Sequence, residues 1–222
     1  MVSQLPKPNA TEVFYPDSDD QPMASNTEQY RWIVAIQQNL DWLLKDAFVA
    51  GDLFWYPIEG RSDISVAPDV MIALGRPKGK RLSYKQWIED NVPPQIVFEI
   101  LSPSNTRREM ESKLLFFERH GVEEYYIYDT ERKELNGFTR GELGLAHIED
   151  ISDKWVSPLL NIRFDMSGDE LQLFRPDDTP FSTYREVLEK AEAAEQKAEA
   201  AEQKALRLAE KLRTLGIDPD QV

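Results

Sequence analysis

The sequence contains no cysteine and only two histidines, His120 and His147. Without cysteine, the chain has no disulfide bond, no thiol nucleophile and no zinc–thiolate site. With only two histidines, a metal site must rely mainly on oxygen ligands, which suit Mg²⁺ or Mn²⁺ better than Zn²⁺. The lack of cysteine also fits a reducing compartment.

Long apolar stretches and an excess of basic residues are missing as well. No apolar run approaches the roughly 20 residues that span a bilayer, so we expect no membrane association. The first residues, MVSQLPKPNATEVFYPDSDDQP, lack the basic start and apolar stretch of a signal peptide, and we expect a cytoplasmic protein. A net charge of −14 argues against a general nucleic-acid coat protein. It leaves room for an enzyme that touches phosphate through one local basic patch.

Three segments of different character follow one another along the 222 residues. Residues 1–24 contain four prolines and a DSDD run, and we predict a flexible arm. Residues 25–184 alternate between helical and strand patterns, which predicts an α/β domain with a central mixed sheet flanked by helices. The expected order is a helix over 27–46, strands over 47–58, 64–74 and 95–101, a helix over 105–121, a strand over 123–129, a hairpin over 133–150 and a last strand over 171–177.

Residues 185–222 have a different pattern. The heptad AEAAEQK occurs twice without change, and helix-forming residues dominate the segment. Small and apolar residues recur at alternating steps of four and three, which predicts a coiled-coil seam. Its members are Val187, Ala191, Ala194, Ala198, Ala201, Ala205, Leu208, Leu212 and Leu215. We therefore expect a homo-oligomer, most simply a dimer, although a single solvated helix is the alternative because alanine buries little area.

Two carboxylates and a lysine stand among apolar residues. Glu99 interrupts the apolar run of PQIVFEIL, and Asp69 immediately precedes the run VMIAL. An unpaired carboxylate in a buried strand is costly, so such an acid is protonated, paired or bound to a cation. One divalent cation resolves both burial problems, because a hard ion takes several oxygen ligands. Lys113 lies on the helix after the Glu99 strand, and we expect its ammonium group to point at the same pocket.

These residues also have purely structural interpretations. Asp69 fits a turn or strand-entry residue that is hydrogen-bonded to the backbone. Glu99 fits an ion pair with Arg107, Arg108 or Lys113. Each residue taken alone is ambiguous. The two acids and the lysine together, in the expected order of helices and strands, favour a metal site.

Further polar residues are candidates for the same surface. Asp52 lies on the strand before Asp69 and is a possible third acid, with a surface position as the alternative. Basic residues near the expected site are candidates for contacts with a phosphate backbone, although exposed basic loops are common. They are Arg76, Lys78, Lys80 and Arg81 in one loop, and Arg107 and Arg108 at the start of the second helix.

The segments PDV, VFEILSPSNT and ESKLLFFERHGVEEYYIYD resemble the signature of the Uma-two family of endonucleases, in its cyanobacterial type. That family is assigned to the PD-(D/E)XK restriction-endonuclease-like superfamily, and the resemblance covers about residues 26–184. It implies a helix–strand–strand–strand–helix–strand core. It also implies that Asp69 and Glu99 are the two acids of the motif, with the main-chain carbonyl of Ile100 as a further metal ligand.

One position departs from the superfamily pattern. Leu101 stands where the pattern has a lysine two residues after the second acid. A lysine from the following helix is a variation of the superfamily, and Lys113 fits it. The sequence thus favours an Mg²⁺- or Mn²⁺-dependent endonuclease that hydrolyses DNA through Asp69, Glu99 and Lys113. The alternative is a catalytically inactive nuclease fold that serves as an oligomerising scaffold.

Overall fold

The computed structural model describes residues 13–18 and 24–214. The chain divides into two compact units, Met1–Phe181 and Ser182–Val222. Leu215 of the predicted seam, and the parts of the predicted arm at 1–12 and 19–23, lie outside the described residues. The three predicted segment boundaries remain a prediction.

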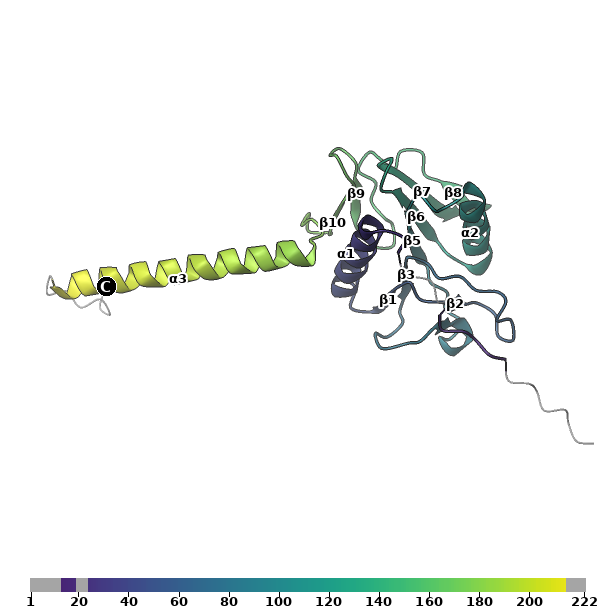
Figure 1. Cartoon of the computed structure of the whole chain (residues 1–222), viewed down its shortest axis with the longest axis horizontal. Coiled ribbons are helices and arrows are strands. Elements are labelled where there is room, and N and C mark those ends of the chain that lie inside the picture. The colour runs from purple at the N-terminus through teal and green to yellow at the C-terminus, as the bar shows by residue number, and fades with distance from the viewer. Residues whose placement is uncertain (1–12, 19–23, 215–222) are drawn as a thin grey trace, which may run out of the picture. The chain divides into compact units, whose positions relative to one another are not determined.

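A six-stranded mixed sheet forms the centre of the first unit (Figure 1). Its strand order is β1-β3-β5-β6-β7-β8, and all neighbours are antiparallel except the parallel pair β5 and β6. These strands are β1 (Ala47–Gly51), β3 (Val70–Leu74), β5 (Ile96–Leu101), β6 (Glu124–Asp129), β7 (Glu134–Gly141) and β8 (Gly144–His147). The predicted mixed sheet flanked by helices is confirmed.

Two short strand pairs supplement this sheet. The first pair is parallel and joins β2 (Trp55–Tyr56) to β4 (Tyr84–Lys85), which a 3₁₀ turn over Gln86–Ile88 follows. The second pair is antiparallel and joins β9 (Arg163–Asp165) to β10 (Gln172–Phe174). The sequence predicted β10 but not its short partner β9.

The strand predicted over 47–58 is wrong in its continuity. It divides into β1 and β2, because the chain turns at Asp52, whose φ is 47°. Aspartate tolerates this left-handed conformation better than most residues, since its short polar side chain bonds locally. The break places Asp52 just beyond the last residue of β1.

Helix α1 (Thr27–Leu43) covers one face of the sheet. Ser25 and Asn26 are both residue types that cap helices, and Asn26 is the cap, because its side chain accepts a hydrogen bond from the N–H of Gln29 at 2.8 Å. The apolar residues that recur at helical spacing along α1 lie in the hydrophobic core, with Leu43 packed at its edge. The fully or nearly fully buried members are Trp32, Ile33, Ile36 and Leu40.

Helix α2 (Arg107–His120) contacts the other face. Thr106 and Glu109 form a reciprocal capping box at its start. It ends at Gly121, whose φ of 95° is a left-handed conformation that glycine adopts without strain. Both ends of the helix are thereby fixed by local sequence.

Strand β5 separates two hydrophobic clusters. Phe98 and Ile100 belong to the cluster that α1 covers, whereas Val97 belongs to the one that contains Phe117 of α2. Because successive side chains of a strand point to opposite faces, Glu99 points to the α2 side with Val97. The alternation of β5 thus places this carboxylate under α2.

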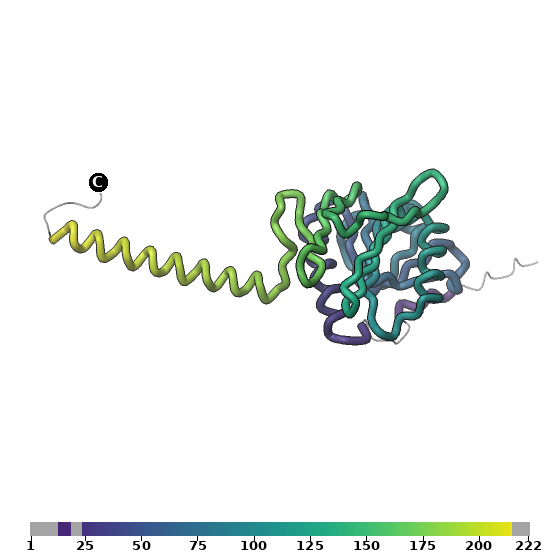
Figure 2. The backbone as a smooth tube through the Cα atoms, turned by 90° about the horizontal axis from the view of Figure 1, so that it is seen from above, coloured from purple at the N-terminus to yellow at the C-terminus, as the bar shows by residue number. Residues whose placement is uncertain are grey.

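The described part of the second unit is one continuous helix, α3 (Tyr184–Thr214), of 31 residues (Figures 1 and 2). The Thr183 hydroxyl accepts a hydrogen bond from the N–H of Glu186 at 3.3 Å, and the Glu186 carboxylate accepts one from the N–H of Thr183 at 2.7 Å. No residue of α3 is buried. Across the part of the chain that the structure describes, no helix is long and apolar enough to cross a membrane.

Candidate active site

Two neighbouring strands bring the two predicted acids together. Strands β3 and β5 are antiparallel, with Val70 opposite Phe98. Continuing that register by one residue sets Asp69 opposite Glu99. The carboxylates come from positions 30 residues apart, and only the pairing of the strands unites them.

Lys113 of α2 points at the same place. Its Nζ donates a hydrogen bond to Oε2 of Glu99 at 2.7 Å. The side chain of Glu99 is 2% exposed and that of Lys113 is 19% exposed, so the pair is largely shielded from water. This contact agrees with the predicted orientation of Lys113 and equally with the structural alternative of a Glu99–Lys113 ion pair, while Arg107 pairs with Glu111 instead of Glu99.

Each acid has a distinct environment. Oδ2 of Asp69 accepts a hydrogen bond from the main-chain N–H of Ile100 at 2.6 Å. Glu99, by contrast, uses only Oε2, and its other oxygen, Oε1, is buried without a hydrogen-bond partner among the described residues. A buried oxygen of this kind is uncommon and calls for an explanation, such as an ion or a water at the site.

Gln29 completes the cluster, although the sequence did not predict it as a site residue. Its Nε2 donates a hydrogen bond to the main-chain carbonyl of Ile100 at 2.8 Å, and its Oε1 accepts one from the N–H of Ser25 at 2.8 Å. The Gln29 side chain also acts on Asp69: burial raises the pKa of that carboxyl, and the amide of Gln29 opposes the rise. The signal was available: Gln29 is a polar residue four positions before Ile33, on the buried stripe of α1.

The charges at the site do not balance. When ionised, Asp69, Glu99 and Lys113 sum to one negative charge. Burial raises the pKa of Asp69 from 3.8 to about 6, although the Ile100 N–H and Lys113 oppose that change. Burial likewise raises the pKa of Glu99 from 4.5 to about 8, against the ammonium group of Lys113. Burial alone lowers the pKa of Lys113, but the Glu99 and Asp69 carboxylates raise it above its ordinary value.

Asp52 lies at the edge of this cluster. Its N–H donates to the main-chain carbonyls of Pro68 and Asp69, both at 3.2 Å. Its carboxylate raises the pKa of Asp69 by like-charge repulsion. The side chain is exposed, unlike those of Glu99 and Lys113.

The donor set fits a hard divalent cation. No group of three or more His, Cys, Asp and Glu side chains that could hold a metal occurs within 13–18 and 24–214. A cation at this place would be held by the two carboxylates and the Ile100 carbonyl, and a hard divalent cation prefers oxygen donors of this type. The buried, unpaired Oε1 of Glu99 is the observation that favours a ligand at this position.

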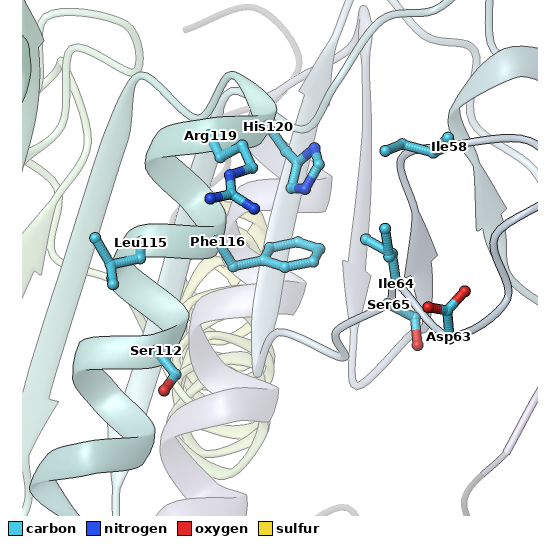
Figure 3. A pocket seen from close by; sticks show the side chains of 9 residues that line it. All are labelled: Ile58, Asp63, Ile64, Ser65, Ser112, Leu115, Phe116, Arg119 and His120. Atoms are coloured by element: carbon cyan, nitrogen blue, oxygen red, sulfur yellow. The ribbon is translucent and has the colours of Figure 1, made fainter.

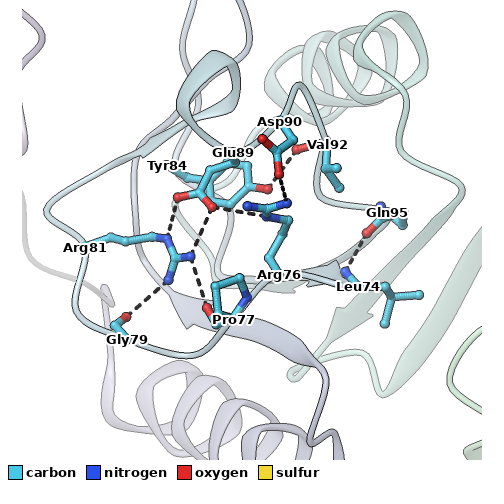
Figure 4. A network of polar contacts seen from close by, with 10 residues as sticks. All are labelled: Leu74, Arg76, Pro77, Gly79, Arg81, Tyr84, Glu89, Asp90, Val92 and Gln95. Carbon is cyan, nitrogen blue, oxygen red and sulfur yellow. Dashed lines mark hydrogen bonds and ion pairs between the residues drawn. The ribbon is translucent and has the colours of Figure 1, made fainter.

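Two arginines of the predicted phosphate-binding loop contact one glutamate instead (Figure 4). Arg81 binds Glu89 through two hydrogen bonds of 2.6 Å and 3.0 Å. Arg76 reaches Glu89 at 3.3 Å and Asp90 at 2.6 Å. The guanidinium groups draw the pKa of Glu89 below its ordinary value, with Arg81 as the larger cause. This network ties the loop to the 3₁₀ turn.

The other predicted basic residues differ in their surroundings. Lys78 pairs with Asp41 at 2.8 Å. Arg107 is 93% exposed and pairs with Glu111 along the helix at 2.9 Å. Lys80 and Arg108 are exposed. The basic residues with the most accessible charge are therefore Lys80, Arg107 and Arg108.

A pocket of about 450 Å³ lies between α2 and the segment 58–65 (Figure 3). Its wall mixes apolar, hydroxyl and charged side chains: Ile58, Asp63, Ile64, Ser65, Ser112, Leu115, Phe116, Arg119 and His120. Asp69, Glu99 and Lys113 do not line it. The pocket and the acid–lysine cluster are thus separate features of α2.

Known proteins were compared with the chain by sequence family and by structure. The family model Uma2, described as "Putative restriction endonuclease", matches residues 21–167. Among solved structures, the chain is similar to one described as a "putative nuclease belonging to DUF820" from Anabaena variabilis ATCC 29413. The two share 11% sequence identity with a TM-score of 0.45, over 61% of this chain and 75% of that one. No curated protein matches the chain.

Proposed function

We propose that this chain, which belongs to the Uma2 family, is a nuclease that hydrolyses DNA phosphodiester bonds with the help of Mg²⁺ or Mn²⁺. The observation that carries the proposal is the buried Oε1 of Glu99, which has no hydrogen-bond partner among the residues that the structure describes and lies beside Asp69 and Lys113. A structural ion pair alone explains Oε2 of Glu99 but leaves Oε1 unsatisfied.

In this proposal three groups hold the cation. They are the carboxylates of Asp69 and Glu99 and the main-chain carbonyl of Ile100. The carbonyl keeps its hydrogen bond from Gln29 while it binds, because a carbonyl oxygen has two lone pairs. Asp52 is a further candidate ligand, since its charge already acts on Asp69.

When bound, the cation supplies Lewis-acid polarisation of a phosphoryl oxygen and a lowered pKa for a bound water. Lys113 stabilises the negative charge that develops on the phosphate, or orients the attacking water, from its place 2.7 Å from Glu99. Gln29 and the Ile100 N–H hold Asp69 in one orientation. The lysine from α2 replaces the one that the superfamily motif has at the position of Leu101.

DNA contacts are proposed for exposed basic residues: Arg107 and Arg108 start the helix that follows the Glu99 strand, whereas the loop with Lys80 follows Leu74, at the end of β3 opposite to Asp69. Lys80, Arg107 and Arg108 have exposed charges that can meet phosphate. Arg76 and Arg81 contribute mainly by holding the loop that carries Lys80. A few exposed basic residues are compatible with a net charge of −14.

Two parts of the proposal concern the whole chain. It acts as a homo-oligomer, most simply a dimer, to which α3 contributes, and it works in the cytoplasm. The competing function is a catalytically inactive nuclease fold that serves as an interaction scaffold. The observation in its favour is Leu101 in place of the motif lysine.

The test combines Mn²⁺ binding by calorimetry with plasmid nicking on the same samples. We expect Asp69→Asn and Glu99→Gln to lose both binding and nicking. Matched controls are Asp150→Asn and Glu123→Gln, the same chemical changes at exposed positions, which should keep both. A wild-type protein that neither binds Mn²⁺ nor nicks DNA would make Glu99 a structural acid and favour the scaffold.

A further inference from the structure

Helix α3 presents its apolar side chains to solvent. No residue of this helix is buried, and Val187, Leu188 and Leu208 are 50%, 44% and 53% exposed. A helix that carries an apolar stripe normally covers it with another element. The stripe of α3 therefore lacks a partner within the described part of the Ser182–Val222 unit.

The stripe follows a heptad, whose positions are lettered a to g. Positions a are Tyr184, Ala191, Ala198, Ala205 and Leu212, and positions d are Val187, Ala194, Ala201 and Leu208. Large apolar residues occupy the two ends of the seam, and alanine occupies the middle. Such alanine layers allow two helices to approach closely.

The charges of the repeat do not stabilise a single helix. Opposite charges three or four residues apart provide that support, as Arg107 and Glu111 do on α2 at 2.9 Å. Between residues 191 and 204 no such pair is possible, because each lysine in that stretch has only alanine, arginine or leucine at those distances. The glutamates are instead spaced to repel one another, as in Glu192 with Glu195 and Glu195 with Glu199.

The same charges complement a second copy of the helix. Lysine occupies every g position, at Lys190, Lys197, Lys204 and Lys211, whereas glutamate occupies the two central e positions, at Glu195 and Glu202. In a parallel coiled coil, each g residue meets the e residue five positions further along the other helix. Lys190 then meets Glu195 of the second copy, and Lys197 meets its Glu202, and both contacts occur twice by symmetry.

An antiparallel pair reverses this outcome. There g positions face g positions and e positions face e positions, so lysine meets lysine and glutamate meets glutamate. Like charges in contact disfavour that arrangement. The charge pattern therefore distinguishes between the two directions, while the apolar seam supplies the contact.

We propose that α3 pairs with α3 of a second copy of this chain, in parallel and in register. The occupant of the exposed stripe is thus the identical stripe of another chain. Residue 182 leads into the first turn of α3 in each copy. In a parallel pair, the chain segments that precede α3 in the two copies therefore enter at the same end of the coiled coil. This inference specifies the direction and register of the proposed oligomer and does not depend on nuclease activity.

Disulfide cross-linking of the full chain tests the direction, and the natural absence of cysteine gives a clean background. The two single variants are Val187→Cys and Leu212→Cys, one near each end of the seam. In the parallel register each variant forms a disulfide with itself, and a mixture forms no cross-linked heterodimer. An antiparallel pair would give the reverse, because Val187 would then face Leu212 of the other copy, and this result would overturn the proposal.

Sedimentation equilibrium of charge variants tests the pairing itself. We expect Glu195→Lys with Glu202→Lys to weaken association by roughly tenfold or more, because every g–e contact becomes repulsive. The matched control is Glu192→Lys with Glu199→Lys, an equal charge change at b positions, which should leave association unchanged. Both variants gain favourable charge spacing within the helix, so a loss of helix does not explain a difference between them.

A complementary variant closes the test. Lys190→Glu with Lys197→Glu should associate weakly alone and should bind the Glu195→Lys, Glu202→Lys variant at least as tightly as the wild type binds itself. A wild-type chain that remains monomeric at all concentrations would refute the proposal. Equal weakening by the control variant would refute it as well, because general charge would then be the cause.

Discussion

Lys113 Nζ lies 2.7 Å from Oε2 of Glu99, although the two residues belong to different elements on either side of a buried layer. Glu99 sits in the centre of the sheet and is 2% exposed on its side chain. The lysine satisfies one carboxylate oxygen and leaves the other, Oε1, without a partner among the described residues. Lys113 therefore has two candidate roles: it holds Glu99 in place, and it supplies a positive charge to the reaction. Variants of Lys113 can distinguish these roles.

Replacing Lys113 tests its chemical role. We expect Lys113→Met to lower the nicking rate by roughly 100-fold or more, because it removes a cation that acts on the developing negative charge. Mn²⁺ binding should persist or strengthen, since the carboxylates then lack a competing positive charge. Calorimetry and plasmid nicking on the same protein measure both quantities.

The matched control for that change is Arg119→Met, which removes an exposed cation from the same helix. It should keep the nicking rate of the wild type. Loss of Mn²⁺ binding together with activity in Lys113→Met would contradict the prediction, because it would show that the lysine maintains the shape of the site.

Gln29 is expected to position the metal ligands. Gln29→Leu removes the hydrogen bond to the Ile100 carbonyl and the contact with Asp69. By analogy with residues that orient metal ligands in general, we expect Mn²⁺ affinity to fall by roughly 10- to 100-fold. Calorimetric titration of the variant measures this change.

Gln38→Leu is the control for Gln29, because it makes the same substitution at an exposed position of α1. Its Mn²⁺ affinity should match that of the wild type. If Gln29→Leu lowers only the midpoint of thermal unfolding and binds Mn²⁺ normally, the glutamine merely satisfies the backbone of β5.

Stability without metal should fall as the pH rises. The folded-state pKa values of Asp69 and Glu99, about 6 and about 8, lie above the ordinary values of 3.8 and 4.5. The folded state therefore binds more protons than the unfolded state between about pH 4 and pH 8. The free energy of unfolding decreases through this window as each carboxyl loses its proton, whereas Lys113 stays protonated throughout because its pKa is raised.

Urea unfolding at pH 5, 7 and 8.5 in the presence of a chelator measures this decrease. Glu99→Gln cannot ionise at residue 99 and should reduce the slope. Excess Mg²⁺ should stabilise the wild type most at the highest pH, because the ligands are then deprotonated. A wild-type stability that rises across the same window without metal would show that other groups dominate the titration.

Glu89 is expected to stabilise the loop that carries Arg76 and Arg81 and to have no direct part in DNA hydrolysis. Its side chain is 11% exposed and it binds both Arg76 and Arg81. Glu89→Gln leaves two poorly exposed guanidinium groups without their common carboxylate. We expect the free energy of unfolding to fall by about 2 kcal/mol or more.

Asp90→Asn is the comparison for Glu89→Gln. This carboxylate also pairs with Arg76, but its side chain is 79% exposed. Exposed ion pairs contribute little, so the loss should stay below about 1 kcal/mol. Urea unfolding of both variants decides the point, and equal losses would show that burial of Glu89 is not the cause.

Local sequence signals were sufficient for most of the secondary structure. Ser25 or Asn26 is a recognisable cap before α1, and Gly121 a recognisable end of α2, because capping depends on residues within one turn. The prediction of one continuous strand over 47–58 was wrong at Asp52, where the strand is interrupted. Gly51 and Asp52 are residue types common in turns, but the apolar residues on both sides favour a strand, and the left-handed backbone at Asp52 accompanies its contacts with the neighbouring strand.

For the candidate site, the sequence by itself determined which residues are unusual for their surroundings: Glu99 and Asp69 are acids beside apolar runs. A buried charge needs a partner whatever the fold, because burying it unpaired is costly. Only the tertiary structure decided which partners they have. The register of β3 against β5 sets the two acids opposite each other, and the packing of α2 brings Lys113 to Glu99. The sequence marks Gln29 as a polar residue on a buried helical stripe but does not indicate its role, because burying an uncharged amide costs less free energy than burying a charge. Its role arises only from contact with a strand that lies 71 residues away in the sequence.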